Sequence, residues 1–226
     1  MSPEPDDADD LAGTVAGTEA DLEPDLAEQL VLAALEPLRA GASFRAAFDA
    51  AVAVGAVELP SPVWEVVGAT DVDADVSAST PWLLRQVENR PPPDDMTAIW
   101  FGLHEVRGSG PGRVETFVAV NGGAGFPDPG WLEAHSWDPP GYAPTPGLRS
   151  LLPATVDADP GVRRAVRTGL VLAYGAGYAA AVIEAVGPAH LLAGRDQLEI
   201  TTGFADGDVL LVGRLTPSGL DRAAQI

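Results

Sequence analysis

Residues 168–183, TGLVLAYGAGYAAAVI, form a stretch of sixteen residues without a single charged side chain. A helix buried on one face only keeps charged residues on the other face. A helix with this sequence must therefore be enclosed on most of its circumference. The stretch is shorter than the roughly 20 residues that a bilayer requires, and its Gly and Ala content is poorly suited to lipid. The sequence predicts the central core helix of a soluble domain.

The flanking residues extend this helix to residues 160–186. Asp159 followed by Pro160 is typical of an N-cap and a first helical position, and Gly187-Pro188 ends the pattern. Three glycines at positions 169, 175 and 177 each cost roughly 1 kcal/mol of helix propensity relative to Ala. We expect close approach of another element to compensate for them.

Two β-hairpins are predicted on either side of the helix. Residues 97–106 and 113–121 are rich in aromatic and branched side chains and are separated by RGSGPG. Residues 197–204 and 208–216 flank Asp206-Gly207, a strong hairpin signal. The order β-β-α-β-β predicts an α+β fold, with a four-stranded antiparallel sheet and the long buried helix on one face.

An N-terminal helical pair precedes this unit. Apolar residues recur at three-four spacing over residues 25–39, and a second stripe runs through residues 44–52 behind the capping residue Ser43. We assign residues 23–56 to a helical hairpin and residues 57–226 to the α+β domain. The hairpin either covers the larger unit or forms a separate docking module.

The segment between the helical pair and the first hairpin is less regular. Residues 63–67 fit a short strand, and DVDADVSAST at residues 71–80 reads as an exposed acidic loop. Thr80 is then expected to cap a short helix that has Pro81 at its first position. The acidic loop lacks the glycine and the distal glutamate of an EF-hand, so we do not assign it as a calcium site.

Composition narrows the classes of function. A net charge of −20 disfavours binding to nucleic acid or to an anionic membrane surface. Cysteine is absent, which excludes disulfides and thiolate chemistry. Lysine is also absent, and the many Ala, Gly, Pro and Val residues indicate a G+C-rich, bacterial genome, with salt adaptation as the alternative cause of the acidity.

Half of the net charge lies near the start of the chain. Residues 1–28 contain ten acidic residues and no basic one. Few large apolar side chains occur in residues 1–22, so we expect a disordered acidic leader there. Its first residues, MSPEPDDADD, resemble no secretory signal, and a cytoplasmic location is expected.

The long aromatic loop at residues 121–149 is the predicted binding region. It is too long for an ordinary connection in a compact domain, and its aromatic side chains need a surface to pack on. Trp and Tyr are favoured anchors of protein interfaces. The candidate binding residues are Asp128, Trp131, Glu133, His135, Trp137, Asp138 and Tyr142.

Signals of catalysis or cofactor binding are weak. His104 and Glu105 are neighbours on a predicted strand and should point to opposite faces. His135, Ser136 and Asp138 are adjacent in sequence, but a catalytic triad is defined by geometry and not by adjacency. No histidine pair has the spacing of metal ligands. The glycines at residues 122–125 are followed by FPDPGW and not by the helix that a phosphate loop needs. No cofactor is assigned.

Arg163, Arg164 and Arg167 form a basic cluster in the first turns of the long helix. Cations are unfavourable there because of the helix dipole. One interpretation is a solvated face offset by Asp157 and Asp159. The other is a contact for an acidic partner, or for the acidic leader of this same chain.

Three functional hypotheses follow. The first is a non-enzymatic protein-binding module, with a basic partner favoured; one version is an immunity-type inhibitor that presents carboxylates to a nuclease-like toxin. The second is a small enzyme or ligand-binding domain, with a pocket under the aromatic loop formed by His135, Asp138, Glu115 and His104. The third is a structural subunit of a homo-oligomer, assembled through hairpin edges or the helical pair.

Overall fold

The computed structural model describes residues 25–107, 114–124, 135–205 and 209–222. The predicted disorder of residues 1–22 lies outside these ranges. In chain order, the elements are α1 (Leu26–Arg39), α2 (Phe44–Glu58), α3 (Val63–Gly68), α4 (Val72–Asn89), β1 (Ala98–Arg107), β2 (Val114–Gly123), β3 (His135–Trp137), α5 (Pro146–Leu151), η2 (Pro153–Thr155), α6 (Pro160–Ala165), η3 (Val166–Leu170), α7 (Val171–Val186), α8 (Pro188–Leu191), β4 (Leu198–Phe204), β5 (Val209–Thr216) and β6 (Gly219–Asp221).

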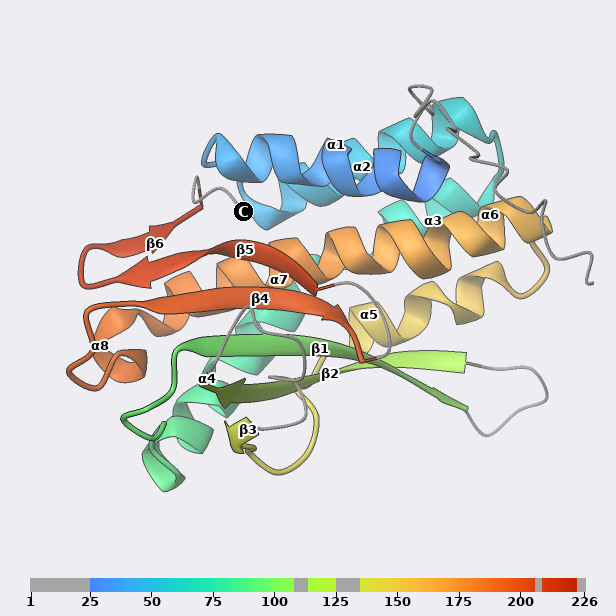
Figure 1. The fold of residues 1–226 in the computed structure, drawn as a ribbon. Coiled ribbons are helices and arrows are strands. Elements are labelled where there is room, and N and C mark those ends of the chain that lie inside the picture. The colour runs from blue at the N-terminus through green and yellow to red at the C-terminus, as the bar shows by residue number, and fades with distance from the viewer. Residues whose placement is uncertain (1–24, 108–113, 125–134, 206–208, 223–226) are drawn as a thin grey trace, which may run out of the picture.

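The described strands form one mixed sheet in the order β3-β2-β1-β4-β5-β6 (Figure 1). Strands β1 and β4 run parallel at its centre, with Ala98 opposite Glu199 and Leu103 opposite Phe204. Every other neighbouring pair is antiparallel. Helices α4 and α7 lie behind the sheet in Figure 1, and the hairpin of α1 and α2 lies along α7.

The predicted α+β class and both hairpins are confirmed, but the four-stranded, purely antiparallel sheet is wrong. The two hairpins are joined through the parallel β1–β4 pair, and the short strands β3 and β6 extend the sheet to six strands. The burial of β1 explains the difference, because residues 98–103 are buried on both faces of the strand. Such a strand belongs in the middle of a sheet, paired on both sides.

The predicted core helix is confirmed. Elements α6, η3 and α7 form one continuous helix, Pro160–Val186, which is long and apolar enough to cross a membrane by length and composition alone. However, 78% of its most apolar window is buried inside the protein. Tyr174 and Tyr178 are fully buried, and the Tyr174 ring packs edge-on against Phe44 at 5.0 Å between ring centroids. Protein side chains therefore cover the surface that lipid would otherwise cover.

The helix glycines allow close packing, as expected. A Cβ atom at Gly177 would meet the Phe44 ring at 2.2 Å, and one at Gly175 would meet Thr202 Oγ1 at 2.6 Å. At Gly169 the neighbouring atoms are backbone atoms of Ala27 in α1, at 2.7 Å. The helical pair thus rests directly on η3, and its buried side chains belong to the same hydrophobic core as the sheet.

Several helix boundaries predicted from sequence are also confirmed. The Ser43 side chain accepts a hydrogen bond from the Ala46 amide at 3.2 Å, and Asp159 accepts one from Gly161 at 2.8 Å. Gly41 and Gly187 follow their helices with φ values of 84° and 81°. These are left-handed conformations, which glycine adopts without the steric cost of a Cβ atom.

The predictions for residues 63–80 are wrong. The expected short strand is helix α3, and the expected acidic loop and the short helix after it are one helix, α4. Asp71, and not Thr80, is its N-cap and accepts from the Ala74 amide at 3.0 Å. Pro81 lies inside α4, although an internal proline costs about 3 kcal/mol of helix stability. Packing of Leu83 and Val87 in the core offsets this cost.

Asp75 in α4 is fully buried rather than exposed. Its carboxylate accepts hydrogen bonds from the amides of Gly147 and Leu148, at 2.9 and 3.0 Å, and from the Tyr174 hydroxyl. Burial and the neighbouring Asp75 charge raise the pKa of Tyr174 well above its ordinary value, so the phenol stays a donor. Asp75 therefore caps α5 from another helix and ties α4 and α5 to α7.

Candidate functional site

The predicted aromatic binding region is only partly described. Asp128, Trp131 and Glu133 lie outside the described residues. Trp137 is fully buried, and its indole Nε1 donates to the Arg90 carbonyl at 2.7 Å. A tryptophan held in this way is part of the core, so it is not an exposed anchor for a partner.

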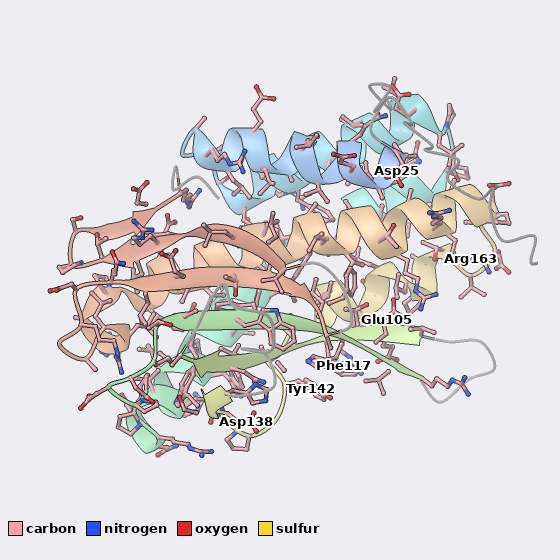
Figure 2. The ribbon with its side chains drawn as sticks, viewed as in Figure 1. Asp25, Glu105, Phe117, Asp138, Tyr142 and Arg163 are labelled. Carbon is pink, nitrogen blue, oxygen red and sulfur yellow. The ribbon has the colours of Figure 1, made fainter. Side chains whose placement is uncertain are left out.

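The remaining residues of this region are spread along β2, with His135 opposite Gly123 at its end and Tyr142 beside Phe117 farther back along the strand. His135 and Asp138 are exposed, and the Asp138 carbonyl accepts from Arg90 at 2.8 Å. Tyr142 is 47% exposed and lies beside Phe117, with 5.0 Å between ring centroids (Figure 2).

The four polar residues of the predicted enzyme pocket are not brought together in one described cavity. The ring of His104 packs against Trp100 and Tyr142, at 5.7 and 6.1 Å between centroids. Glu115 instead forms an ion pair with Arg149 at 2.8 Å. Neither His135 nor Asp138 lines any of four well-formed clefts in the described part of the chain, whereas His104 lines one of them.

His104 should make the stability of the protein depend on pH. Burial lowers its pKa below the ordinary value of 6.5, and its Nε2 atom is buried without a hydrogen-bond partner among the described residues. As the pH falls below about 6.5, the unfolded chain binds a proton that the folded chain disfavours. We expect the free energy of unfolding to fall as the pH falls from there toward the folded-state pKa.

Urea unfolding of the wild type and of His104→Asn at a series of pH values measures this effect. The variant should lose less stability on acidification, because it lacks the titrating ring. An identical pH dependence in the two proteins would show that His104 does not contribute.

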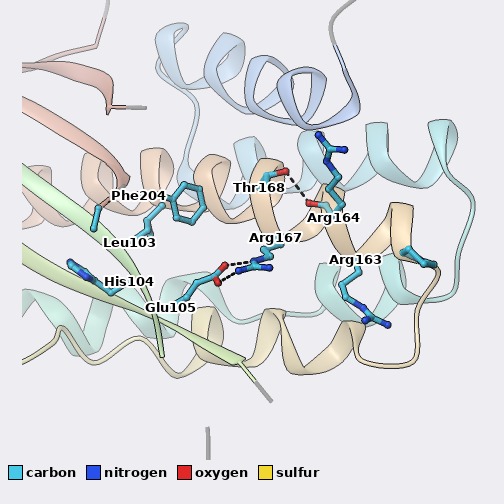
Figure 3. Close-up of a pocket in the computed structure, with 10 residues that line it drawn as sticks. Leu103, His104, Glu105, Arg163, Arg164, Arg167, Thr168 and Phe204 are labelled. Carbon is cyan, nitrogen blue, oxygen red and sulfur yellow. Dashed lines mark hydrogen bonds and ion pairs between the residues drawn. The ribbon is translucent and has the colours of Figure 1, made fainter. Parts of the chain in front are cut away.

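A large cleft lies at the carboxyl ends of the parallel strands β1 and β4. Its volume is about 760 Å³, within the range of ordinary ligand sites. Leu103 and Phe204 line it from the two strands, and the first turns of the long helix supply the opposite wall (Figure 3). That wall includes η3, a π-helical turn, which is a feature often found at functional sites.

The three arginines of the predicted basic cluster all line this cleft, but in different roles. Arg163 donates to the carbonyls of Thr155, Val156 and Ala158, at 3.3, 2.6 and 3.2 Å. It therefore holds the chain that leads into the helix, although it is also exposed to solvent.

Arg167 and Arg164 differ from Arg163. Arg167 forms a two-pronged ion pair with Glu105 at the end of β1. Arg164 is exposed and extends toward α1, away from Arg163 (Figure 3). Within the ranges that the structure describes, no acidic group forms an ion pair with Arg164.

Two further clefts share residues with the first. One, of about 540 Å³, reaches the start of α1 and shares Thr168 and Phe204. The other, of about 190 Å³, reaches Val114 and Val156 and shares Arg163 and Arg167. We call these three neighbouring clefts together the arginine groove. Each of them is lined in part by the first turns of the long helix.

The walls of the groove combine apolar and charged side chains. The larger aliphatic and aromatic residues are Val31, Leu103, Val114, Leu152, Val156, Leu172 and Phe204. Sequence reasoning found the arginines from their spacing, but not this apolar surface, because its members come from five separate elements and a connecting segment. No group of three or more His, Asp or Glu residues in the described part of the chain is placed to hold a metal ion.

Comparisons of the chain with models of known families, with curated proteins and with solved structures found no match.

Proposed function

We propose that this protein is a non-enzymatic protein-binding module, and that its arginine groove binds an extended acidic segment of a partner protein. The observation that supports this proposal is that three neighbouring clefts share lining residues, Thr168 and Phe204 in one case and Arg163 and Arg167 in the other. A long, open surface of this kind fits a peptide segment better than a small metabolite, which is usually enclosed on most sides.

The charges favour an acidic occupant. Three arginines and a single glutamate line the central cleft, which is where an acidic segment is favoured, whereas Asp25 and Glu28 line the neighbouring cleft at the start of α1. Arginine matches carboxylates well because its planar guanidinium presents several donors. The apolar wall, with the half-buried Phe204 ring at its centre, provides burial for apolar side chains between the acidic ones.

The other functional hypotheses have less support from the described residues. Inhibition of a basic, nuclease-like partner remains a prediction from the net charge of −20. An enzyme pocket under the aromatic loop, a homo-oligomer and a cytoplasmic location likewise remain predictions.

Charge reversal at Arg164 tests the proposal. Arg164→Glu should weaken binding of a fluorescein-labelled peptide of alternating Glu and Leu by about tenfold or more, since a lost ion contact and a new repulsion together exceed about 1.4 kcal/mol. Fluorescence anisotropy at low and moderate salt gives the dissociation constants. Weakening of the wild-type complex by salt is also expected, because exposed charges are screened.

Arg85→Glu is the matched control. Arg85 is exposed on α4, outside the arginine groove, and its reversal changes the net charge by the same amount. It should leave the affinity within about twofold of the wild type, a difference well below 1.4 kcal/mol. Equal weakening by both variants would mean that only the overall charge matters. Absence of binding in every protein would contradict the proposed function.

A further inference from the structure

The start of the described chain lies on the wall of the arginine groove. Asp25, the N-cap of α1, lines the cleft that shares Thr168 and Phe204 with the central one. Asp25 and Arg163 lie toward the same end of the molecule (Figure 2). Residues 1–24 therefore join the chain beside the groove that we assign to an acidic segment.

We propose that residues 1–24, the predicted acidic leader of residues 1–22 together with Glu23 and Pro24, bind in the arginine groove of their own chain and compete there with the partner; the name leader covers residues 1–24 from here on. This inference rests on the proposed function for the identity of the competitor. Three properties of the leader support this choice of occupant: its negative charge, its attachment beside the groove and its length.

The leader has the required chemistry. Eight of its residues are acidic and none is basic: Glu4, Asp6, Asp7, Asp9, Asp10, Glu19, Asp21 and Glu23. Shortly before Asp25 the sequence reads Asp21-Leu22-Glu23, so an apolar side chain alternates with carboxylates there. This pattern matches a groove with an apolar wall and cationic side chains.

Arg164 is the expected contact of the leader. It extends toward α1, the element to which the leader is joined (Figure 3), while Arg167 is engaged by Glu105. The start of α1 itself carries Asp25 and Glu28 and so does not attract acidic residues. The leader must therefore pass this region for its carboxylates to reach the arginines.

The length of the leader permits this path. An extended chain spans at most about 3.3–3.6 Å per residue, so Glu19 can lie up to roughly 20 Å from Asp25. A tethered segment at this range has an effective concentration of the order of millimolar. A contact with a dissociation constant of about a millimolar or less is then formed in about half of the molecules or more.

A spin label tests the contact in the full-length protein. The chain contains no cysteine, so Thr14→Cys provides a single attachment site for a nitroxide in the leader. We expect the nitroxide to broaden the amide NMR signals of Arg164, Thr168 and Phe204 at low salt. The broadening should disappear when the eight leader acids are changed to Asn or Gln, and in Arg164→Glu, but persist in Arg85→Glu.

Competition with the Glu-Leu peptide tests the consequence. The full-length chain with the neutralised leader should bind the peptide about tenfold more tightly than the wild type, because no occupied fraction must be displaced. If both proteins bind the peptide with the same affinity, the inference is overturned. It is also overturned if the broadening of the amide signals persists after the leader acids are neutralised. A third outcome is broadening that depends on Arg164, while neither the wild type nor the variant with the neutralised leader binds the peptide. This outcome would support the leader contact and overturn the proposed function.

Discussion

Asp75→Ala is expected to lower the free energy of unfolding by about 3–5 kcal/mol. The substitution leaves the amides of Gly147 and Leu148 and the Tyr174 hydroxyl without the carboxylate that accepts their hydrogen bonds. Each buried donor that loses its partner costs about 1–3 kcal/mol. The start of α5 also loses its cap, and α4 and α5 lose a shared attachment to α7.

Urea unfolding followed by circular dichroism measures this effect. Asp73→Ala is the matched control, because Asp73 is an exposed carboxylate in the first turn of the same helix. Its loss should cost less than about 1 kcal/mol, the size of a helix-dipole contribution. Similar costs for the two variants would mean that the buried hydrogen bonds of Asp75 do not stabilise the fold.

Gly169→Ala is expected to destabilise the protein by about 3 kcal/mol, although Ala normally stabilises a helix relative to Gly by roughly 1 kcal/mol. The new Cβ atom would lie 2.7 Å from the Cα and carbonyl oxygen of Ala27. Backbone atoms cannot rotate away as a flexible side chain can, so α1 must move off η3. The midpoint of thermal unfolding should fall accordingly.

Gly68→Ala serves as the control for this substitution. A Cβ atom there would meet only a methyl group of Val52, at 3.2 Å, and a small shift of that side chain relieves the contact. We expect a change within about 1 kcal/mol. If Gly169→Ala proves as stable as Gly68→Ala, then α1 does not pack as closely on the long helix as the structure shows.

Features that depend on neighbouring residues were predictable from sequence. The uncharged stretch marks the core helix, and the caps Ser43 and Asp159 and the terminator Gly187 are each recognised within a few residues of the helix end that they define. The two hairpins are likewise local, because a short turn fixes which strands pair.

Features that depend on distant residues were missed. The hydrogen bonds of Asp75 reach residues 72 to 99 positions away, so nothing near DVDAD shows that one of its carboxylates is buried. The parallel pairing of β1 with β4 was likewise not apparent from either hairpin. The candidate site also combines local and distant features. The spacing of the arginines is visible in the sequence, whereas the approach of Phe204 and Leu103 to them is not.

The central strand pair has a consequence for how the protein is made. The Thr201 hydroxyl donates a hydrogen bond to the Ile99 carbonyl, and the Thr202 hydroxyl donates one to the Phe101 carbonyl. These contacts span 102 and 101 residues of the sequence. Until β4 leaves the ribosome, the nascent chain exposes one edge of β1 and part of an apolar helix. Closure over such a distance is slow, so this edge of β1 stays unpaired until the β4–β5 hairpin docks against it.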